Sequence, residues 1–454
     1  MSGCNLRRSW LFAFLLSSWA LGGSMGWALA AELELPGPSL DWVEATSAPE
    51  LKLVEPELRE ARLRKPSASA EGPLEFWQLT SDESSTDAAF EDRGAVLETP
   101  PISSGSAAEL SPELAALGDK VRQVLAMYYP RHQNTRSNTP WEVMHAIIAY
   151  GVDTQLFQGG PGGEKVNAVG WMCFNRPCGG EQMLLVDRGK IDARRGPGVQ
   201  GHAGQFLAIL AQSHVKADYP LHVSGKNFTL ADLVEHEKET CVAGEELTFK
   251  LISLMHYLDS DETWTTRDGQ PWSIQRLVRE ELKQPIRGAA CGGTHRLMGF
   301  SYAVNKRVQR GKPLVGEFLR AQKFVQDYHR YTFSLQNPDG SFSSEWFTRR
   351  GDNPDIDRRL KTSGHILEWI AFSLSDQELR DPRMIKAVDQ LATILLKHPK
   401  HAWEIGPLGH GLHGLSIYNS RVFEGGKTGR PQNIAEGSAD ASALEARLPG
   451  QAGE

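Results

Sequence analysis

The sequence is poor in cysteine, has no excess of positive charge and begins with only a short apolar run. It has five cysteines in 454 residues, and 49 lysines and arginines stand against 56 acidic residues, for a formal net charge of −7. Nucleic-acid-binding domains need a basic surface, so this balance excludes nucleic acid as an expected partner. The apolar run WLFAFLL is shorter than the roughly 20 residues that span a bilayer, which argues against a retained membrane anchor.

The first 30 residues have the pattern of a secretory signal peptide. Arg7 and Arg8 precede the apolar run, and Ala28, Leu29 and Ala30 provide a small-residue exit. We therefore expect cleavage after Ala30, an exported location, periplasmic or secreted, and no stable membrane insertion after cleavage. The two arginines also resemble a twin-arginine signal, so the export route stays open.

Residues 31–110 form an acidic segment rich in proline, serine and alanine. They hold 17 acidic against 6 basic residues. Such a composition cannot bury enough apolar surface to offset the entropy of ordering, which predicts a disordered linker. The stretch GPLEFWQL within it has an alternative interpretation as a short interaction motif. Residues 425–454 are predicted to be a disordered tail, which leaves residues 111–424 as one nearly neutral domain.

Four cysteines remain after removal of the signal peptide, and an even number in an exported protein favours disulfides. Cys173 and Cys178 bracket the turn-forming FNRP between two strand-like runs, so we expect a disulfide across a hairpin within a β insertion at about residues 157–200. Zinc binding by this pair is the alternative, but it lacks a second close pair of ligands. Cys241 and Cys291 are candidates for the other bridge, although the sequence does not fix the connectivity.

The rest of the chain is mostly helical in pattern, and histidines recur along it at intervals of 39 to 70 residues. They lie in or beside apolar helical stretches, at His145, His202, His256, His295, His365 and His413. A repeat of this size is typical of stacked or circularly arranged helix pairs. Polar-faced stretches such as EFLRAQKFVQDYHRYTFSL alternate with uniformly apolar ones, as an outer and an inner ring require. We therefore predict an all-α fold, an α/α toroid of about six helical hairpins around a central cavity.

One stretch of the chain resembles a known superfamily. The segment SLQNPDGSFS is similar to the glutamine and aromatic repeat of terpenoid cyclases, with Phe342 where that repeat usually has tryptophan, and KTSGHILEWIAFSL follows it closely. At repeat level the resemblance covers about residues 245–420. It implies the α/α-toroid superfamily, which includes terpenoid cyclases, protein prenyltransferases, thioester domains and several polysaccharide lyases. It implies the fold and does not choose an activity.

The active-site motifs of these relatives are matched only in part. Residues 259–263 resemble the acidic motif of cyclases but follow a helix, which favours a solvated loop. Cys291 and His365 match two zinc ligands of prenyltransferases, whereas Ala289 stands where an aspartate is needed. Residues 178–182 read CysGlyGlyGluGln, with one glycine more than the thioester motif.

Two other motifs have simple structural explanations. The glycines at 196, 198 and 201 match a dinucleotide-binding pattern, but no parallel α/β unit surrounds them, so we interpret them as an entry loop. The aspartates at 352, 355 and 357 could hold Ca²⁺, but adjacent arginines favour a salt-bridged turn.

Four histidines follow small or hydroxylated residues at the apparent starts of apolar helices: His202, His295, His365 and His410. A histidine in the first turn is kept neutral by the helix macrodipole and can act as a general base or a metal ligand. Because the inner helices of a toroid begin at one mouth, we expect these four to converge there as candidate catalytic residues. The alternative is that each bonds a neighbouring repeat.

Three further residues are candidates for ligand binding. Trp369 follows His365 by one helical turn, and an indole beside an imidazole suits a sugar ring. Trp346 and His413 complete this group. No metal or cofactor is assigned.

The expected function is therefore broad. The sequence favours an exported helical-toroid protein that acts as a cell-envelope binding or structural module for an unknown envelope ligand or polysaccharide. The alternative is a carbohydrate-active enzyme, a polysaccharide lyase or glycosidase, with histidines at the toroid mouth as acid and base. The binding module is preferred because no pair of carboxylates can be placed for glycoside hydrolysis.

Overall fold

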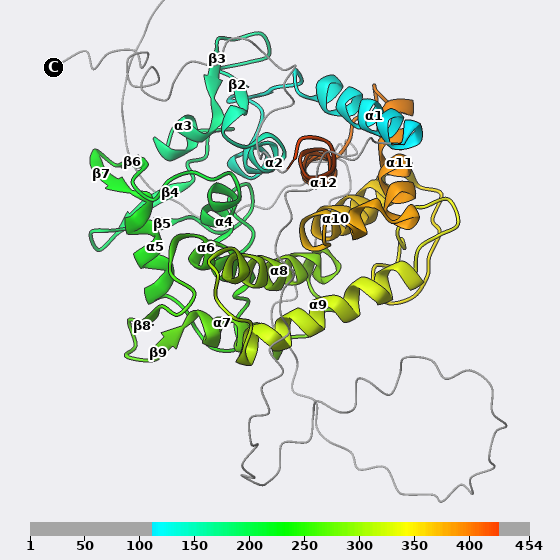
Figure 1. Cartoon of the computed structure of the whole chain (residues 1–454). Helices are drawn as coiled ribbons and strands as arrows, with labels where there is room; N and C mark the ends of the chain where they lie inside the picture. The colour runs from blue at the N-terminus through cyan, green and yellow to red at the C-terminus, as the bar shows by residue number, and fades with distance from the viewer. Residues whose placement is uncertain (1–110, 426–454) are drawn as a thin grey trace, which may run out of the picture. The chain divides into compact units, whose positions relative to one another are not determined.

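The structure is a computed structural model that describes residues 111–425 (Figure 1). The predicted signal peptide and acidic linker, and the tail from residue 426, lie outside the described residues. The described chain is mostly helical, with short strands paired in small sheets. The prediction of a helical domain with a minor β component is confirmed at this level.

The first two helices each begin at a capping residue. Ser111 caps α1 (Pro112–Tyr128) by accepting a hydrogen bond from the Leu114 N–H. Thr139 caps α2 (Pro140–Tyr150), and Glu142 bonds back to the Thr139 N–H at 2.7 Å. This reciprocal capping box satisfies two N–H groups that a helix start otherwise leaves unpaired.

The strands form short hairpins beside the helices. β1 (Gln133–Asn134), β2 (Gln155–Phe157) and β3 (Lys165–Asn167) make one sheet, in which β1 and β2 are parallel and β2 and β3 antiparallel. Three antiparallel pairs follow: β4 (Leu184–Asp187) with β5 (Lys190–Ala193), β6 (Pro220–Val223) with β7 (Lys226–Thr229), and β8 (Thr263–Thr265) with β9 (Pro271–Ser273). The predicted insertion thus contains strands, and further hairpins lie beyond it.

Neither predicted disulfide is formed, because all four cysteines of the described chain are free thiols. The stretch expected to be a strand before Cys173 turns into α3 (Ala168–Cys173), which Asn167 caps by accepting a hydrogen bond from the Gly170 N–H. Cys173 and Cys178 therefore do not face each other across a hairpin. Cys241 donates a hydrogen bond to the Glu237 carbonyl, and Cys291 lies in a short turn ahead of α8.

Six helices pack against one another in a sequence that returns to its start. They are α2, α4 (Gln205–Gln212), α6 (Thr248–Tyr257), α8 (Thr294–Gln309), α10 (Ile356–Ser373) and α12 (Ile405–Phe423). Each contacts the next in this order, and α12 contacts α2 (Figure 1). Most of their residues are buried, which explains their uniformly apolar composition.

The remaining long helices alternate with these six in the sequence and pack against them from outside. They are α1, α5 (Leu230–Glu239), α7 (Ile274–Leu282), α9 (Gly316–Ser334) and α11 (Pro382–Lys397). Their buried residues recur every three to four positions; in α11 these include Met384, Val388 and Leu391. The predicted alternation of amphipathic and apolar helices is confirmed.

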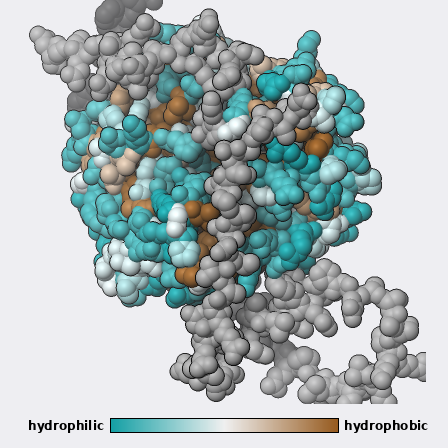
Figure 2. Space-filling view, in the orientation of Figure 1, coloured by the Kyte–Doolittle hydropathy of each residue, from teal (hydrophilic) through white to brown (hydrophobic). Residues whose placement is uncertain are grey.

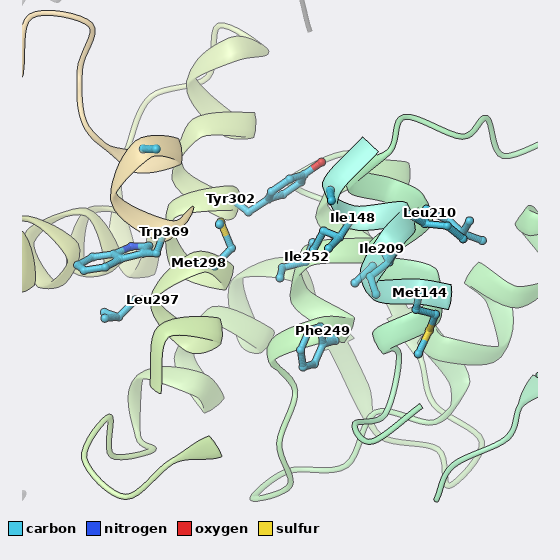
Figure 3. Close-up of a cluster of buried hydrophobic side chains, with 14 of the residues drawn as sticks. Met144, Ile148, Ile209, Leu210, Phe249, Ile252, Leu297, Met298, Tyr302 and Trp369 are labelled. Carbon is cyan, nitrogen blue, oxygen red and sulfur yellow. The ribbon is translucent and has the colours of Figure 1, made fainter. Parts of the chain in front are cut away.

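The core lies among the six apolar helices and between them and the outer helices. Figure 3 shows part of it, where Met144 and Ile148 of α2 approach Ile209 of α4 and Ile252 of α6. The face of the molecule shown in Figure 2 is mostly hydrophilic, with apolar residues in separate patches. Among the described residues, no helix combines the length and apolarity needed to cross a membrane.

Candidate metal centre

Five histidines, from four of the apolar helices and the turn before α4, lie together near the N-terminal ends of α4 and α8. We call this set the histidine cluster: His145 of α2, His202 just before α4, His295 of α8, His365 of α10 and His410 of α12. The ring centroids of His365 and His410 are 4.0 Å apart, and four further pairs are 5.2 to 5.9 Å apart. The convergence expected for His202, His295, His365 and His410 is therefore present, and their catalytic role stays a prediction.

The remaining apolar helix, α6, contributes an aromatic side chain next to these histidines. Phe249 of α6 lies 5.0 Å from the ring of His202 and 5.1 Å from that of His295. His256, which the sequence repeat places in this series, lies two turns further along α6 and contacts Tyr302 instead. The cluster thus has an apolar wall where the repeat predicts another histidine.

Glycines in α12 allow its neighbours to approach closely enough to form the cluster. A Cβ atom on Gly409 would lie 2.3 Å from the carbonyl oxygen of His145, and one on Gly414 would lie 2.8 Å from the backbone nitrogen of Glu368. Glycine inside a helix costs about 1 kcal/mol relative to alanine. Close packing against α2 on one side and α10 on the other offsets this cost and brings His145, His365 and His410 together.

Two histidines of the cluster are oriented by backbone carbonyls. Nδ1 of His145 lies 2.7 Å from the carbonyl oxygen of Trp141, and Nδ1 of His365 lies 2.7 Å from that of Lys361. A carbonyl only accepts hydrogen bonds, so each Nδ1 carries the proton. The lone pair is therefore on Nε2 of both rings.

Two other histidines are oriented by carboxylates. Nδ1 of His410 donates to Oε2 of Glu368 at 2.7 Å, and Nδ1 of His202 donates to Oε2 of Glu246 at 2.6 Å. The second oxygen of Glu368 accepts from Nδ1 of His413 at 2.6 Å. A carboxylate behind an imidazole is the usual arrangement around metal-bound histidines, because it fixes the tautomer and raises the basicity of the free nitrogen.

His295 differs from the others because neither of its ring nitrogens has a hydrogen-bond partner. Both nitrogens are buried, and the residue is only 8% exposed. A buried polar group without a partner costs about 1–3 kcal/mol, so such a group calls for a ligand. Burial and the nearby rings of His410 and His202 hold the pKa of His295 well below its usual range.

A cysteine completes a compact set of possible metal ligands. Sγ of Cys291 and one ring nitrogen each of His295 and His365 all lie within 4.8 Å of one another. Cys291 has a φ of 48°, and Gly292 and Gly293 also have positive φ, so three successive left-handed residues turn the chain into α8. Non-glycine residues rarely adopt this conformation, and such strain tends to occur at functional sites.

The cluster is held in the protonation states that suit metal binding. Burial, with the nearby ring of His410, lowers the pKa of His145 to about 3, and burial likewise holds the pKa of His365 well below its usual range. Burial alone would raise the pKa of Glu368, but His410 and His413 together hold it well below its usual range. The imidazoles of His145, His295 and His365 are therefore neutral, and the carboxylate of Glu368 is charged. Burial raises the pKa of Cys291 to about 12, so its thiolate needs a cation beside it.

The predicted position in the first turn of a helix is wrong for two of these histidines. α10 begins at Ile356 and α12 at Ile405, so His365 and His410 lie well inside their helices and away from the positive end of the macrodipole. The small residues before His365 lie within α10, where they pack against α12. Burial is the principal cause of the lowered pKa of His365.

The predicted ligand-binding residues divide into two groups. Trp346 contacts the ring of His365 at 5.7 Å and borders the cluster, and His413 bonds Glu368. Trp369 is fully buried, and its Nε1 donates to Oγ of Ser301 at 3.0 Å. The placement of Trp369 as a platform beside His365 is therefore wrong, because its indole is part of the core.

Four residues of the site escape the sequence analysis. His145 is interpreted there as a marker of the repeat, yet it belongs to the cluster. Glu246 and Glu368 are not singled out, although a glutamate in an apolar helix one turn after His365 is a signal in retrospect. Trp141, whose ring lies 4.1 Å from that of His145, covers the cluster on the α2 side.

The acidic loops are neutralised by basic residues. Asp261 pairs with Arg307 and Lys312. Arg359 pairs with both Asp352 and Asp339. These contacts agree with the interpretation of residues 352–357 as a salt-bridged turn, and they show that the loop at residues 259–263 is salt-bridged as well.

Two surface cavities lie away from the histidine cluster. One of about 560 Å³ is lined by Thr135 and Trp171 among others, and one of about 790 Å³ by Trp264 and Trp272. No histidine lines either of them.

Comparisons of the chain with protein-family models, curated proteins and solved structures find no match.

Proposed function

We propose that the chain is an exported α/α-toroid protein that binds one divalent transition-metal ion, with Zn²⁺ as the first candidate, in the histidine cluster. The ligands are Sγ of Cys291 and ring nitrogens of His295, His365 and His410. The observation that carries the proposal is His295, a buried imidazole with no partner for either nitrogen, within 4.8 Å of a thiol and a second imidazole. The exported location rests on the N-terminal pattern.

The toroid is supported by the order of helix contacts. α2, α4, α6, α8, α10 and α12 contact one another in succession, and α12 meets α2 again. The contacts of His202 with His295, and of His214 with His256 near the other ends of the helices, indicate that α4, α6 and α8 run in the same direction. An α/α toroid consists of an inner ring of parallel helices and an outer ring of helices that connect them.

The ligand chemistry favours zinc or a similar borderline ion. Zn²⁺ binds thiolate sulfur and imidazole nitrogen, usually with four ligands in a tetrahedron. His410 is the fourth ligand because its ring is the nearest to that of His365, at 4.0 Å, and Glu368 fixes its Nδ1 proton. The thiolate and Glu368 together offset the charge of a divalent cation in this buried setting.

The metal explains why the cluster is tolerated in the core. Gathering several neutral imidazoles with unshared nitrogens in a buried site forfeits their hydrogen bonds to water. Binding to a cation satisfies one ring nitrogen each of His295, His365 and His410 at once. Structural Zn²⁺ sites contribute binding free energy directly to folding, so the ion would also tie α8, α10 and α12 together.

A binding or structural role fits better than carbohydrate chemistry. Glycosidases and lyases need an open groove for a polymer and convergent acid and base groups. The histidines of the cluster are largely buried, and Trp369 belongs to the core. A small ion fits this enclosed site, whereas a sugar chain does not.

Metal titration tests the proposal. The full-length protein, stripped with a chelator and titrated with Zn²⁺, should bind one ion per chain. His295→Ala should weaken binding by at least about 100-fold, because the loss of one ligand leaves three. The matched control is His398→Ala, which removes an exposed histidine outside the cluster.

The role of the thiolate is tested with Co²⁺, which reports sulfur ligation by absorbance. Cys291→Ser should abolish the sulfur-to-metal charge-transfer band while circular dichroism shows an unchanged helix content. A wild-type protein that binds no ion, or a His295→Ala variant that binds as tightly as the His398→Ala control, would refute the proposed centre.

A further inference from the structure

A second polar cluster lies at the C-terminal ends of α4, α6 and α8. It consists of four basic side chains around Tyr302, and we call it the cationic cluster: His214 after α4, His256 in α6, and Lys306 and Arg310 at the end of α8. The hydroxyl of Tyr302 lies 2.6 Å from Nδ1 of His256, and Nζ of Lys306 lies 5.6 Å from the centre of the Tyr302 ring. The rings of His214 and His256 are 5.8 Å apart.

These basic groups have no acidic partner. Within residues 111–425, no ion pair involves Lys306, Arg310, His214 or His256. The charges that act on them are one another and, for His214, also His413 of α12. Burial, followed by Lys306, His214 and Arg310, lowers the pKa of His256 to about 3, and burial with the charge of Arg310 lowers the pKa of Lys306.

Helix ends explain only part of this arrangement. Cations are stabilised near the C-terminal carbonyls of helices. Arg310 has this role, because its Nη2 donates to the carbonyl oxygen of His256 at 3.1 Å, but its Nη1 is buried without a partner. Lys306 lies a turn before the end of α8, and its side chain donates no hydrogen bond to a carbonyl of the described residues. A half-buried lysine and a buried guanidinium nitrogen therefore lack acceptors.

We propose that the cationic cluster binds a small oxyanion, a phosphate or carboxylate group, with Lys306 and Arg310 as its principal ligands. Both side chains donate strongly to such groups, and hydrogen bonds between opposite charges are about twice as strong as neutral ones. His214 is exposed and Lys306 and His256 are half-buried, so the cluster is reached from solvent at its edge. Phe372, stacked on Tyr302 at 5.4 Å, forms an apolar wall beside the bound group.

This site is separate from the proposed metal centre. Ile148 follows His145 by one turn on α2, Met298 follows His295 by one turn on α8, and Ile252 lies between Phe249 and His256 on α6. Figure 3 shows these three side chains in the core. These buried apolar side chains lie between the two clusters. Binding at one does not require the other, so the anion site stands even if the chain binds no metal.

Calorimetric titration of the full-length protein with inorganic phosphate, and separately with acetate, tests the proposal. Phosphate binding without acetate binding identifies a phosphate site, and binding of acetate as well identifies a carboxylate site. Lys306→Met should weaken the binding at least about tenfold, as expected for loss of one charged hydrogen bond. Lys306→Arg should retain it, because the charge and donors remain.

The matched control is Lys323→Met, which removes an exposed lysine of α9 outside the cluster. The control should bind the anion as the wild type does, and all variants should keep their helix content. Binding of neither anion by the wild type would overturn the inference. So would a folded Lys306→Met variant that binds as tightly as the control.

Discussion

Replacement of Gly409 by alanine should push α12 away from α2 and loosen the histidine cluster. The added Cβ atom would lie 2.3 Å from the carbonyl oxygen and 3.0 Å from the carbonyl carbon of His145. Atoms in van der Waals contact are about 3.5–4 Å apart, so the two helices must separate by about 1 Å. The shift displaces His145 and His410, which lie on the helices that separate.

Two opposing terms set the expected size of the effect. Alanine gains about 1 kcal/mol over glycine in helix propensity, whereas overpacking of this kind costs about 1–3 kcal/mol, and a clash with backbone lies at the upper end. We expect Gly409→Ala to lower the free energy of unfolding by about 1–2 kcal/mol. Urea denaturation of the metal-free protein, followed by circular dichroism, measures this change.

Gly299→Ala in α8 is the matched control. Its Cβ atom would have its nearest neighbour, the carbonyl oxygen of Thr248, at 3.4 Å, which is an ordinary contact. The propensity gain should therefore dominate, and this variant should be more stable by about 0.5–1 kcal/mol. If Gly409→Ala is as stable as Gly299→Ala, close helix approach does not build the site and our reasoning is refuted.

Three further predictions concern buried charged and titratable groups. Glu368→Gln should weaken Zn²⁺ binding about 10–100-fold in a metal titration, because His410 loses its orienting carboxylate; unchanged affinity would contradict this role. Burial lowers the pKa of His329 to about 4, so the folded protein binds this proton less readily than the unfolded chain does. The free energy of unfolding should therefore fall by up to about 3 kcal/mol as the pH decreases from about 6.5 to 4. His329→Gln should reduce that slope in denaturation curves, and an equal slope would count against it. Lys250→Met should lower the free energy of unfolding by about 3–5 kcal/mol, because it leaves Glu237 as an unpaired buried charge. The two charged groups are 2.8 Å apart, and both side chains are 4% exposed. A thermal melt unchanged from wild type would exclude this.

Local sequence signals predicted the helices but not all of their starts. Thr139 and Glu142 form a capping box that depends only on neighbouring residues, and the structure contains it. The start of α10 was misplaced because the small residues before His365 resemble a loop. Gly364 is small for another reason: a Cβ atom there would lie 3.1 Å from Gly411 of α12. Such a requirement arises from tertiary packing and leaves no local signature.

The candidate site was predicted in part for the same reason. Small residues flanking His202, His295 and His410 mark places where backbones approach, and these histidines converge. His145 was missed because its neighbours in α2 are ordinary helix formers, and its partner glycine lies in α12. The disulfide prediction rested on the expected compartment and on cysteine number, which carry no information about the distance between Cys241 and Cys291.

X-ray absorption at the zinc edge of the zinc-loaded full-length protein tests the central claim most directly. The proposed ligands predict one sulfur at about 2.3 Å and three nitrogens at about 2.0–2.1 Å from the ion, with the sulfur signal lost in Cys291→Ser. A first shell without sulfur, or with more than one, would contradict the assignment of Cys291, His295, His365 and His410 as the metal centre.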